Sequence, residues 1–408
     1  MKASYYLGLD VAKHKVRAAL RGPNGVFLFE HDLPVNAAGR RELLALLEQH
    51  LPEAASLLVL LEATGVLHLH WAAALTRAGY TVLVLNPLMA RRLYTVKNSI
   101  RDNKTDPVDA RGLCAIGALH GAELLEKYRF LLRPQQLALQ RLHTVRKALR
   151  NALTNLKKTY GSLLDLSFPE LGGLMEKDGV GLRALLAQAP TPAAIARKRR
   201  ATLEKDWRLR AKAAQLHALA ADSIADPALA AASAPALRAV LQSIAALEAR
   251  LRALDQEIDQ RALQSGDPKR QALLQTIPGF GPVVAASVLA HLPEELLHAG
   301  NRRTAATRLQ AFMGNDPRLQ QSGQWTGQIK MSKRGVEMLR TAFFQAAFSA
   351  SQHDQELKAF YQRKRSEGKK HEVALSHLMR ILTRRLVAVL RSQQPYRPKE
   401  VLPLQHAA

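Results

Sequence analysis

Two aspartates, Asp106 and Asp109, lie three residues apart in the segment 104–110, which reads KTDPVDA. Pro107 suits the first turn of a helix, where its missing N–H costs no hydrogen bond. A helix starting there would project both carboxylates from one face, an arrangement that can hold a divalent cation against a phosphate. Aspartates are also common capping residues at a helix N-terminus, so the spacing alone leaves both interpretations open.

Two further acids follow apolar segments. Asp10 ends the segment YYLGLD, and Glu62 follows the run SLLVLL. Such runs are typical of buried strands, and functional residues of α/β sheets gather at the carboxyl ends of strands. One such aspartate is usually a turn residue. Four acids in this arrangement instead predict a metal site, with Asp102 as an alternative ligand.

The first 120 residues predict the element order β-β-β-α-β-α-β-α, which is the order of ribonuclease-H-like folds. The expected strands are 5–10, 16–20, 26–29, 56–61 and 81–85, and the expected helices are 36–49, 66–78 and a last one that carries Asp109 and runs to about 119. This order brings the strand-end acids and the last helix to one region of the sheet.

The charge of the chain indicates its partner. Its 408 residues include 59 Lys and Arg against 34 Asp and Glu, a formal charge of +25. A chain this basic usually binds a polyanion, above all nucleic acid, and an excess of arginine suits bidentate phosphate contacts. A hydrophobic content of 47 % is enough for a sizeable core and argues against global disorder.

The single cysteine, Cys114, excludes a disulfide framework and a cysteine-based zinc finger, and it fits a reducing cytoplasm. The N-terminus lacks the long apolar core of a signal peptide. No run approaches the ~20 apolar residues of a membrane span. We therefore expect a cytoplasmic protein without a membrane partner.

Residues 131 to about 265 change to a helical pattern. Two series of apolar residues at alternating steps of three and four predict a coiled coil of two long helices, antiparallel or joining protomers. The series are Leu142, Val145, Leu149, Ala152 and Leu156, and then Leu237, Val240, Ile244, Leu247, Leu251, Leu254 and Ile258. Between them, the basic run 197–200 (RKRR) is either a solvated helix face or a phosphate contact.

Residues 273–284, LLQTIPGFGPVV, read as helix, tight glycine turn and helix, the pattern of a helix-hairpin-helix. Gly279 and Gly281 would let the backbone approach a phosphate at the start of the next helix. A generic helix–turn–helix connection gives the same pattern. An Arg-rich, turn-rich segment follows, then a helical and basic region from Val336 to Leu390, and further candidate phosphate contacts in this part are Arg302, Arg303, Arg318, Lys330, Lys333 and Arg334.

In order and spacing, these motifs resemble the "one-ten" (IS110-type) family of insertion-sequence transposases, also called DEDD transposases, to which the Piv-type DNA invertases are related. The resemblance covers nearly the whole chain. Its marks are GLDVAK (8–13), EATG (62–65), NP (86–87), KTDPVDA (104–110), PGFGP (278–282), QSG (321–323) and SKRG (332–335). Many members carry two serines before the glycine, whereas Gln321 precedes Ser322 here.

The resemblance implies four parts: a RuvC-like domain of RNase H fold at 1–125, a helical coiled-coil dimerisation region at 126–268, a mainly α transposase domain at 269–395 and a tail at 396–408. It implies that Asp10, Glu62, Asp106 and Asp109 bind Mg²⁺ and that Ser322 is the nucleophile on DNA. It also implies a homodimer or homotetramer with composite sites, and a structured bridge RNA that pairs with donor and target DNA.

In the reaction that we expect, Ser322 forms a covalent intermediate with DNA, which the freed hydroxyl of another strand then reverses. Without the resemblance, the residues predict only a metal-dependent enzyme acting on nucleic acid, and Ser322 reads as a turn hydroxyl. The alternative enzyme is a Holliday-junction-type nuclease that uses the same acids with water as nucleophile. A non-catalytic scaffold would predict loss of the acids, and all four are present.

Overall fold

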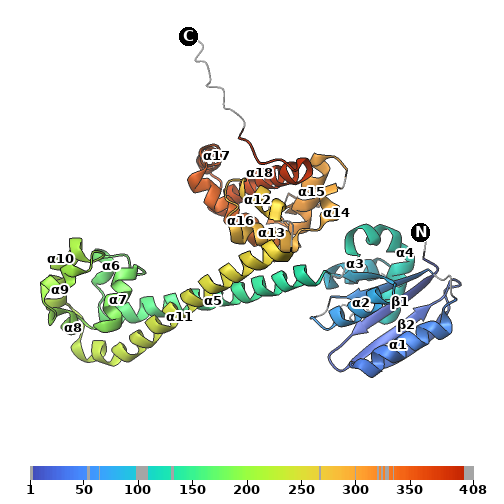
Figure 1. The fold of residues 1–408 in the computed structure, drawn as a ribbon, viewed down its shortest axis with the longest axis horizontal. Coiled ribbons are helices and arrows are strands. Elements are labelled where there is room, and N and C mark those ends of the chain that lie inside the picture. Colours follow the sequence, from blue (N-terminus) through green and yellow to red (C-terminus); the bar gives the residue numbers. More distant parts are fainter. Residues whose placement is uncertain are drawn as a thin grey trace, which may run out of the picture. The chain divides into compact units, whose positions relative to one another are not determined.

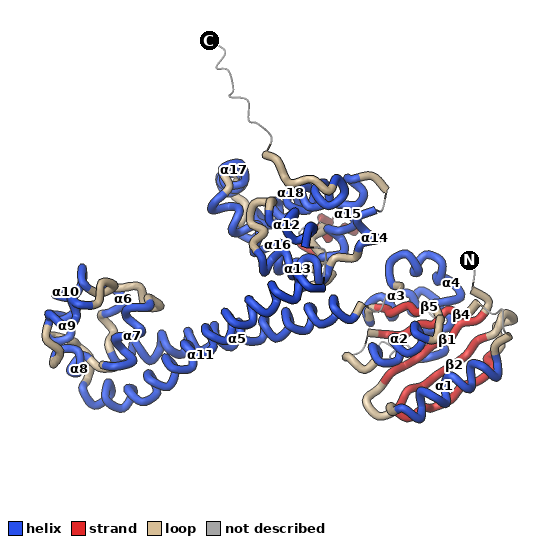
Figure 2. Tube along the Cα trace, in the orientation of Figure 1, coloured by secondary structure: helices blue, strands red, loops and turns tan. Residues whose placement is uncertain are grey.

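The computed structural model describes residues 3–52, 56–63, 65–97, 109–129, 133–265, 268–298, 300–318, 321–322, 325–326, 330–333 and 335–398. The chain divides into two compact units, residues 1–133 and 134–408. The first is a mixed sheet with helices and the second is mainly helical (Figure 1), as the tube view also shows (Figure 2). The predicted division into four parts remains a prediction.

The N-terminal unit is built on a five-stranded sheet in the order β3-β2-β1-β4-β5. Strands β1, β4 and β5 are parallel, and β2 is antiparallel to both of its neighbours. The strands are β1 (Tyr5–Val11), β2 (Lys15–Arg21), β3 (Phe27–Pro34), β4 (Leu57–Glu62) and β5 (Thr81–Leu85). The helices are α1 (Ala37–His50), α2 (His68–Arg77), α3 (Pro87–Lys97) and α4 (Ala110–Tyr128).

Helices cover both faces of this sheet. Successive side chains of each strand point to opposite sides, and both sides are apolar. On one face, Leu7 and Leu9 of β1 pack in a core with residues of α1 and α2, among them Leu43 and Trp71. On the other face, Tyr6 of β1 and residues of β4 pack with α4 and with Ala90 of α3. The sheet therefore carries two separate apolar cores.

The sequence pattern did not predict helix α3. The pair Asn86-Pro87 ends β5 as expected, but Pro87 also begins this helix, and the Asn86 carbonyl accepts hydrogen bonds from the N–H groups of Met89 and Ala90 at 2.9 Å. Proline is favoured at the first helical position because its φ is already helical. Helix α4 also continues to Tyr128, beyond the expected end near 119.

Small residues let α4 lie directly on the sheet. A Cβ added to Gly8 of β1 would lie 2.0 Å from the carbonyl oxygen of Ala110, and a Cβ on Gly117 would lie 2.5 Å from Leu60 Cδ1. The Cys114 thiol donates to the carbonyl oxygens of Tyr6 and Ala19, both at 3.2 Å. Burial raises the pKa of Cys114 to about 12, so this thiol stays protonated and serves packing.

The C-terminal unit contains two long helices, α5 (Pro134–Ser167) and α11 (Pro227–Ser265), which lie side by side (Figure 1). They are antiparallel: Arg146, in the first half of α5, forms an ion pair with Asp255, in the last third of α11, at 2.5 Å. The predicted apolar series of α11 is buried or half-buried throughout. The helices pair within one chain, and contact between protomers remains a prediction.

On α5 the predicted series is only partly correct. Val145 is 50 % exposed and Ala152 is exposed, whereas Leu139, Leu153 and Tyr160 are buried. A helix this long offers more than one line of apolar residues at steps of three and four. The partner helix and the elements at its ends decide which line is buried.

At the turn between the two long helices, a group of short helices forms its own apolar core with both of them (Figure 1). These are α6 (Leu171–Leu174), α7 (Val180–Gln188), α8 (Pro192–Ala196), α9 (Arg200–Lys205), the 3₁₀ helix η1 (Arg210–Lys212) and α10 (Ala213–Ala221). We call residues 168–226, which carry these elements, the tip.

One described helix, α11, is long and apolar enough by composition to cross a membrane, contrary to the expectation that no run comes close. Its apolar window is rich in alanine, and core helices of soluble proteins pass the same test. Because α11 packs along α5, its length is explained by that pairing.

The rest of the C-terminal unit surrounds another apolar core, with α16 (Glu337–His353) and α18 (His371–Ser392) packed together. The elements around them are α12 (Pro268–Gln275), α13 (Pro282–His291), α14 (Glu294–His298), α15 (Arg302–Met313), α17 (Gln355–Ser366) and the two-residue strands β6 (Pro317–Arg318), β7 (Gln321–Ser322), β8 (Trp325–Thr326) and β9 (Lys330–Met331). The helix–turn–helix predicted at 273–284 and the helix resuming at Val336 are both present.

Replacing Gly8 by alanine should destabilise the N-terminal unit, because the new methyl group would overlap the Ala110 carbonyl and push α4 off β1. We expect a loss of about 1–3 kcal/mol in the free energy of unfolding. Gly161→Ala in α5 is the matched control: no atom lies within 4 Å of the added Cβ, so it should stabilise the chain by roughly 0.5–1 kcal/mol.

Urea unfolding followed by circular dichroism measures both changes, and hydrogen exchange read by mass spectrometry should locate the Gly8→Ala effect in β1 and α4. A Gly8→Ala protein with wild-type stability and wild-type exchange would show that α4 does not depend on this contact.

Candidate functional site

Asp10 and Glu62 lie at the carboxyl ends of neighbouring parallel strands, where Glu62 is the last residue of β4 and Asp10 is the last but one of β1. In the register of β1 and β4, Leu9 is opposite Leu61, so the next residue of each strand is an acid. Tyr6 and Leu60 belong to the core beneath α4. Counting in steps of two from them places Asp10 and Glu62 on that same face. Both residues are half-buried.

Asp109 reaches the same region from α4. It is the N-cap of this helix, with φ −71° and ψ 175°, and its Oδ1 accepts a hydrogen bond from the N–H of Gly112 at 2.6 Å. The next residue, Ala110, lies against Gly8, which is two residues before Asp10 on the same face of β1. The close approach of helix and strand therefore brings the Asp109 and Asp10 carboxylates near each other.

The pKa of Asp10 reflects the proximity of these two acids. Burial and the nearby Asp109 carboxylate both raise the pKa of Asp10 above its usual range, and the Lys15 ammonium partly opposes them. Two like charges that share a partly buried location disfavour ionisation of one of them. A cation bound between them would remove that cost.

The predicted partner acids Asp106 and Asp102 lie outside the described residues, and α4 begins only at Ala110. The prediction that one helix projects both Asp106 and Asp109 from the same face is therefore wrong for Asp109, which caps α4 from outside. In the described part of the chain, no three His, Cys, Asp or Glu side chains are grouped closely enough to hold a metal ion.

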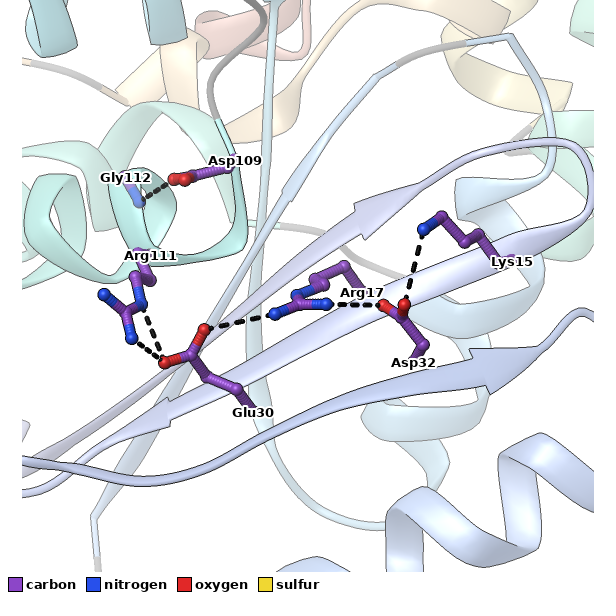
Figure 3. Close-up of polar contacts among 7 residues, drawn as sticks. All are labelled: Lys15, Arg17, Glu30, Asp32, Asp109, Arg111 and Gly112. Atoms are coloured by element: carbon purple, nitrogen blue, oxygen red, sulfur yellow. Dashed lines mark hydrogen bonds and ion pairs between the residues drawn. The ribbon is translucent and has the colours of Figure 1, made fainter.

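A chain of alternating charges lies beside this site (Figure 3). From α4, Arg111 binds Glu30 of β3, with Nε to Oε1 at 2.7 Å, and Glu30 also faces Arg17 of β2 at 3.5 Å. Arg17 then binds Asp32 at 3.2 Å, and Lys15 binds Asp32 at 3.3 Å. The hydrogen bond from Arg111 is the main reason that the pKa of Glu30 lies below its usual range.

These contacts fix the first turn of α4 to β3 and, through Glu30 and Arg17, to β2, next to the cap at Asp109. The sequence pattern did not lead us to predict these contacts. Their signal was present in the two strands, where Lys15 and Arg17 alternate in phase with Glu30 and Asp32, and Arg17 is opposite Asp32 in the β2–β3 register. Cross-strand pairs of opposite charge are favourable.

In the C-terminal unit, Ser322 lies in β7, where its backbone is opposite Trp325 of β8. The predicted cationic positions Arg318 and Lys330 are cross-strand partners in β6 and β9. Backbone hydrogen bonds join the two ends of the segment that contains these strands. The Ser332 N–H donates to the Asp316 carbonyl at 2.9 Å, and the Lys333 N–H donates to the Gly314 carbonyl at 3.1 Å.

The remaining predicted contacts are scattered through the same unit. Gly279 has φ +86°, and a Cβ there would lie 2.1 Å from the Ala346 carbonyl oxygen, so its close approach is to α16. Gly281 precedes α13 with open space around it. Arg302 and Arg303 are exposed in the first turn of α15, and Arg334 lies outside the described residues. Nucleic-acid binding at these positions remains a prediction.

Comparison with known proteins identifies the relatives of this chain. A DEDD-type family model named for IS110 and described as a transposase matches residues 7–169, and a model described as "Transposase IS116/IS110/IS902 family" matches residues 271–362. The first match includes Asp10, Glu62 and Asp109, and the second includes Ser322.

The chain is 27 % identical to the "mini-circle putative transposase for IS117" of Streptomyces coelicolor, over 96 % of this chain and 95 % of that protein. It is 30 % identical to an uncharacterized 42 kDa protein of insertion element IS900 from Mycobacterium paratuberculosis, over 44 % of this chain and 46 % of that protein. An uncharacterized 44.8 kDa protein of insertion element IS116 from Streptomyces clavuligerus is 30 % identical, over 38 % of this chain and 36 % of that protein. The two family models together span more than half of the sequence, and the chain belongs to the IS110/IS116/IS902 family of transposases.

Proposed function

We propose that this chain is the transposase of an insertion sequence, which cuts and rejoins DNA with a carboxylate metal site in the N-terminal unit and a serine nucleophile in the C-terminal unit. The observation that carries the proposal is the proximity of the Asp10 and Asp109 carboxylates, with Glu62 at the matching position of the neighbouring strand, in a chain of a transposase family. The net charge of +25 supports DNA as the partner.

We infer that the N-terminal unit is an RNase H-like, RuvC-like domain. Its support is the strand order β3-β2-β1-β4-β5 with only β2 antiparallel, and helices on both faces. In this domain Asp10, Glu62, Asp106 and Asp109 would hold Mg²⁺. The raised pKa of Asp10 beside Asp109 fits this set, because hard divalent cations prefer carboxylate oxygens.

When bound, Mg²⁺ would neutralise charge on the scissile phosphate and activate an attacking oxygen. Ser322 would supply that oxygen: its Oγ forms a bond to phosphorus, the P–O bond to one DNA strand end breaks, and that end leaves as a hydroxyl that carries the proton. A hydroxyl of another strand then attacks the serine-linked phosphate and releases Ser322. Each step forms one phosphate ester bond and breaks another, so the reaction needs no separate energy source.

Arg318, Lys330, Lys333 and Arg334 lie near Ser322 in sequence and would bind the crowded phosphates. Arg302 and Arg303 would be further phosphate contacts, and Gly279 and Gly281 would form a helix-hairpin-helix contact to the DNA backbone. Following the family resemblance, we propose a bridge RNA as guide, pairing with donor and target DNA. We also propose a cytoplasmic homodimer or homotetramer in which units of different protomers complete one site.

The alternative enzyme is a metal-dependent nuclease of the Holliday-junction type. It would use the same acids, and water would take the place of Ser322. The two functions differ in one chemical product, a covalent link between protein and DNA.

Variants of Asp109 can separate its role as a helix cap from its proposed role as a metal ligand. In Asp109→Asn the side-chain oxygen still accepts the Gly112 N–H, so we expect stability within about 1 kcal/mol of wild type. The lost charge should weaken Mn²⁺ or Mg²⁺ binding roughly tenfold or more. Asp109→Ala should lose the cap as well, at about 1 kcal/mol. Calorimetric titration and urea unfolding measure the two effects, and wild-type metal affinity in Asp109→Asn would leave Asp109 as a cap only.

Asp10 should link metal binding to pH. Its pKa is raised in the folded chain, so without metal the folded state keeps this proton to higher pH than the unfolded chain. The free energy of unfolding should therefore fall as the pH rises from about 4 through the raised pKa. Asp10→Asn should remove that fall. Above this range Mg²⁺ should raise the Tm of wild type by a few °C, on the order of 1 kcal/mol.

The same additions of Mg²⁺ should leave the Tm of Asp10→Asn unchanged, and strand exchange should be lost in this variant. An equal Tm response of both proteins to Mg²⁺ would remove Asp10 from the metal site.

Ser322→Ala should form no covalent protein–DNA adduct on a matched substrate, and DNA rejoining should fall on the order of 10³-fold or more. Denaturing gel electrophoresis with labelled DNA measures the adduct. Ser366→Ala, which removes an exposed hydroxyl from α17, is the control and should keep both activities. Adducts that persist in Ser322→Ala would refute the assignment, and DNA cleavage without adducts in wild type would favour the nuclease.

A further inference from the structure

The tip carries a concentrated positive charge that the proposed reaction does not use. Residues 197–212, from the end of α8 to η1, contain eight cations and two carboxylates. The cations are Arg197, Lys198, Arg199, Arg200, Lys205, Arg208, Arg210 and Lys212, and the carboxylates are Glu204 and Asp206.

Both carboxylates are already occupied by neighbours. Glu204 binds Arg200 at 2.6 Å, and Asp206 binds the Arg208 guanidinium through both of its oxygens, at 2.8 and 2.7 Å. Four cations, Arg197, Lys198, Arg199 and Lys205, make no ion pair or side-chain hydrogen bond within the described residues. Their charge is available to a partner.

An aromatic side chain stands within this run. Trp207 is 78 % exposed, although its neighbours Leu203 and Leu209 are only 2 % and 3 % exposed. Burying an indole contributes roughly 2–3 kcal/mol, so a tryptophan left in water forgoes a stabilisation that the nearby tip core could have supplied. An exposed tryptophan inside a charged patch is typical of a binding surface.

The turn that carries Trp207 is fixed in shape. The N–H groups of Leu209 and Arg210 both donate to the Asp206 carbonyl at 2.9 Å, and the Arg208 N–H donates to Asp206 Oδ1 at 3.0 Å. Leu203 and Leu209 anchor the turn in the tip core on either side. The indole is therefore presented outward by an ordered turn, which lowers the entropy cost of binding through it.

We propose that Trp207 and the free cations around it form a binding site for an unpaired stretch of nucleic acid, separate from the proposed catalytic residues. One base would stack on the indole, and Arg197, Lys198, Arg199 and Lys205 would contact the phosphates of the same strand. Stacking on a single exposed aromatic ring needs a base face that a duplex does not offer. Among the described residues these four cations make no ion pair, so a phosphate can bind them without displacing a carboxylate.

The test uses the full-length chain and oligonucleotides of 12 nucleotides, one of DNA and one of RNA, with a duplex of the same length. Because other basic regions of the chain also bind nucleic acid, the first readout is positional. Oligonucleotides carrying 5-iodouracil should crosslink under ultraviolet light to the peptide containing Trp207. Preference for the RNA or the DNA strand then identifies the sugar that the site accepts.

The second readout is affinity by fluorescence anisotropy. Trp207→Ala should weaken single-strand binding about five- to 150-fold, which corresponds to about 1–3 kcal/mol for one stacked base. Trp207→Phe should recover most of the loss. Lys198→Ala with Arg199→Ala should lower the slope of log affinity against log salt by roughly 0.7 for each lost phosphate contact. Ile224→Ala, at a residue of the tip that is 83 % exposed, should change neither quantity.

Circular dichroism checks that the variants fold. Crosslinks that map elsewhere, together with wild-type affinity in Trp207→Ala, would overturn the proposal. Equal loss of duplex and single-strand binding would overturn the requirement for an unpaired base. A change in sedimentation of Trp207→Ala with unchanged nucleic-acid binding would assign the surface to a protein contact instead.

Discussion

The contact between the backbone of α4 and strand β1 at Gly8 sets the geometry of the N-terminal unit. A helix usually packs on a sheet through side chains, but here the Ala110 carbonyl occupies the space where any other residue would carry a Cβ. Gly117 and Gly121 continue this close approach along α4, against Leu60 and Leu58 of β4. Glycine is costly inside a helix or a strand, so one such contact from β1 and two from α4 indicate that the short distance itself is required.

That distance explains how one aspartate can cap a helix and also lie beside a second carboxylate. Because α4 begins directly over β1, its N-cap Asp109 lies beside Asp10 and satisfies the Gly112 N–H at the same time. A carboxylate has several lone pairs, so capping leaves acceptor capacity for a cation. The ion pair between Arg111, in the first turn of α4, and Glu30 holds this end of the helix in place. The unfavourable proximity of the two acids is then a built-in feature that a bound cation would relieve.

The C-terminal unit is organised around its two long helices. Its two long helices pair over most of their length, and each end carries separate elements: the short helices of the tip near one end of the pair, and α13, which packs on both helices, near the other. Each part has its own apolar core. Binding surfaces in the tip can therefore be changed without disturbing the core around α16 and α18.

The sequence by itself determined the order of strands, the strand-end acids, the long helices and the family, because these depend on local periodicity and on motif residues. It could not decide that Asp109 lies outside its helix, that Pro87 starts α3, or which apolar line of α5 is buried, because each depends on a packing partner far away in the chain. Tertiary structure also decided the charge chain from Arg111 to Lys15 and the exposure of Trp207. Whether a charge is paired or an indole is buried depends on neighbours that the linear pattern does not contain.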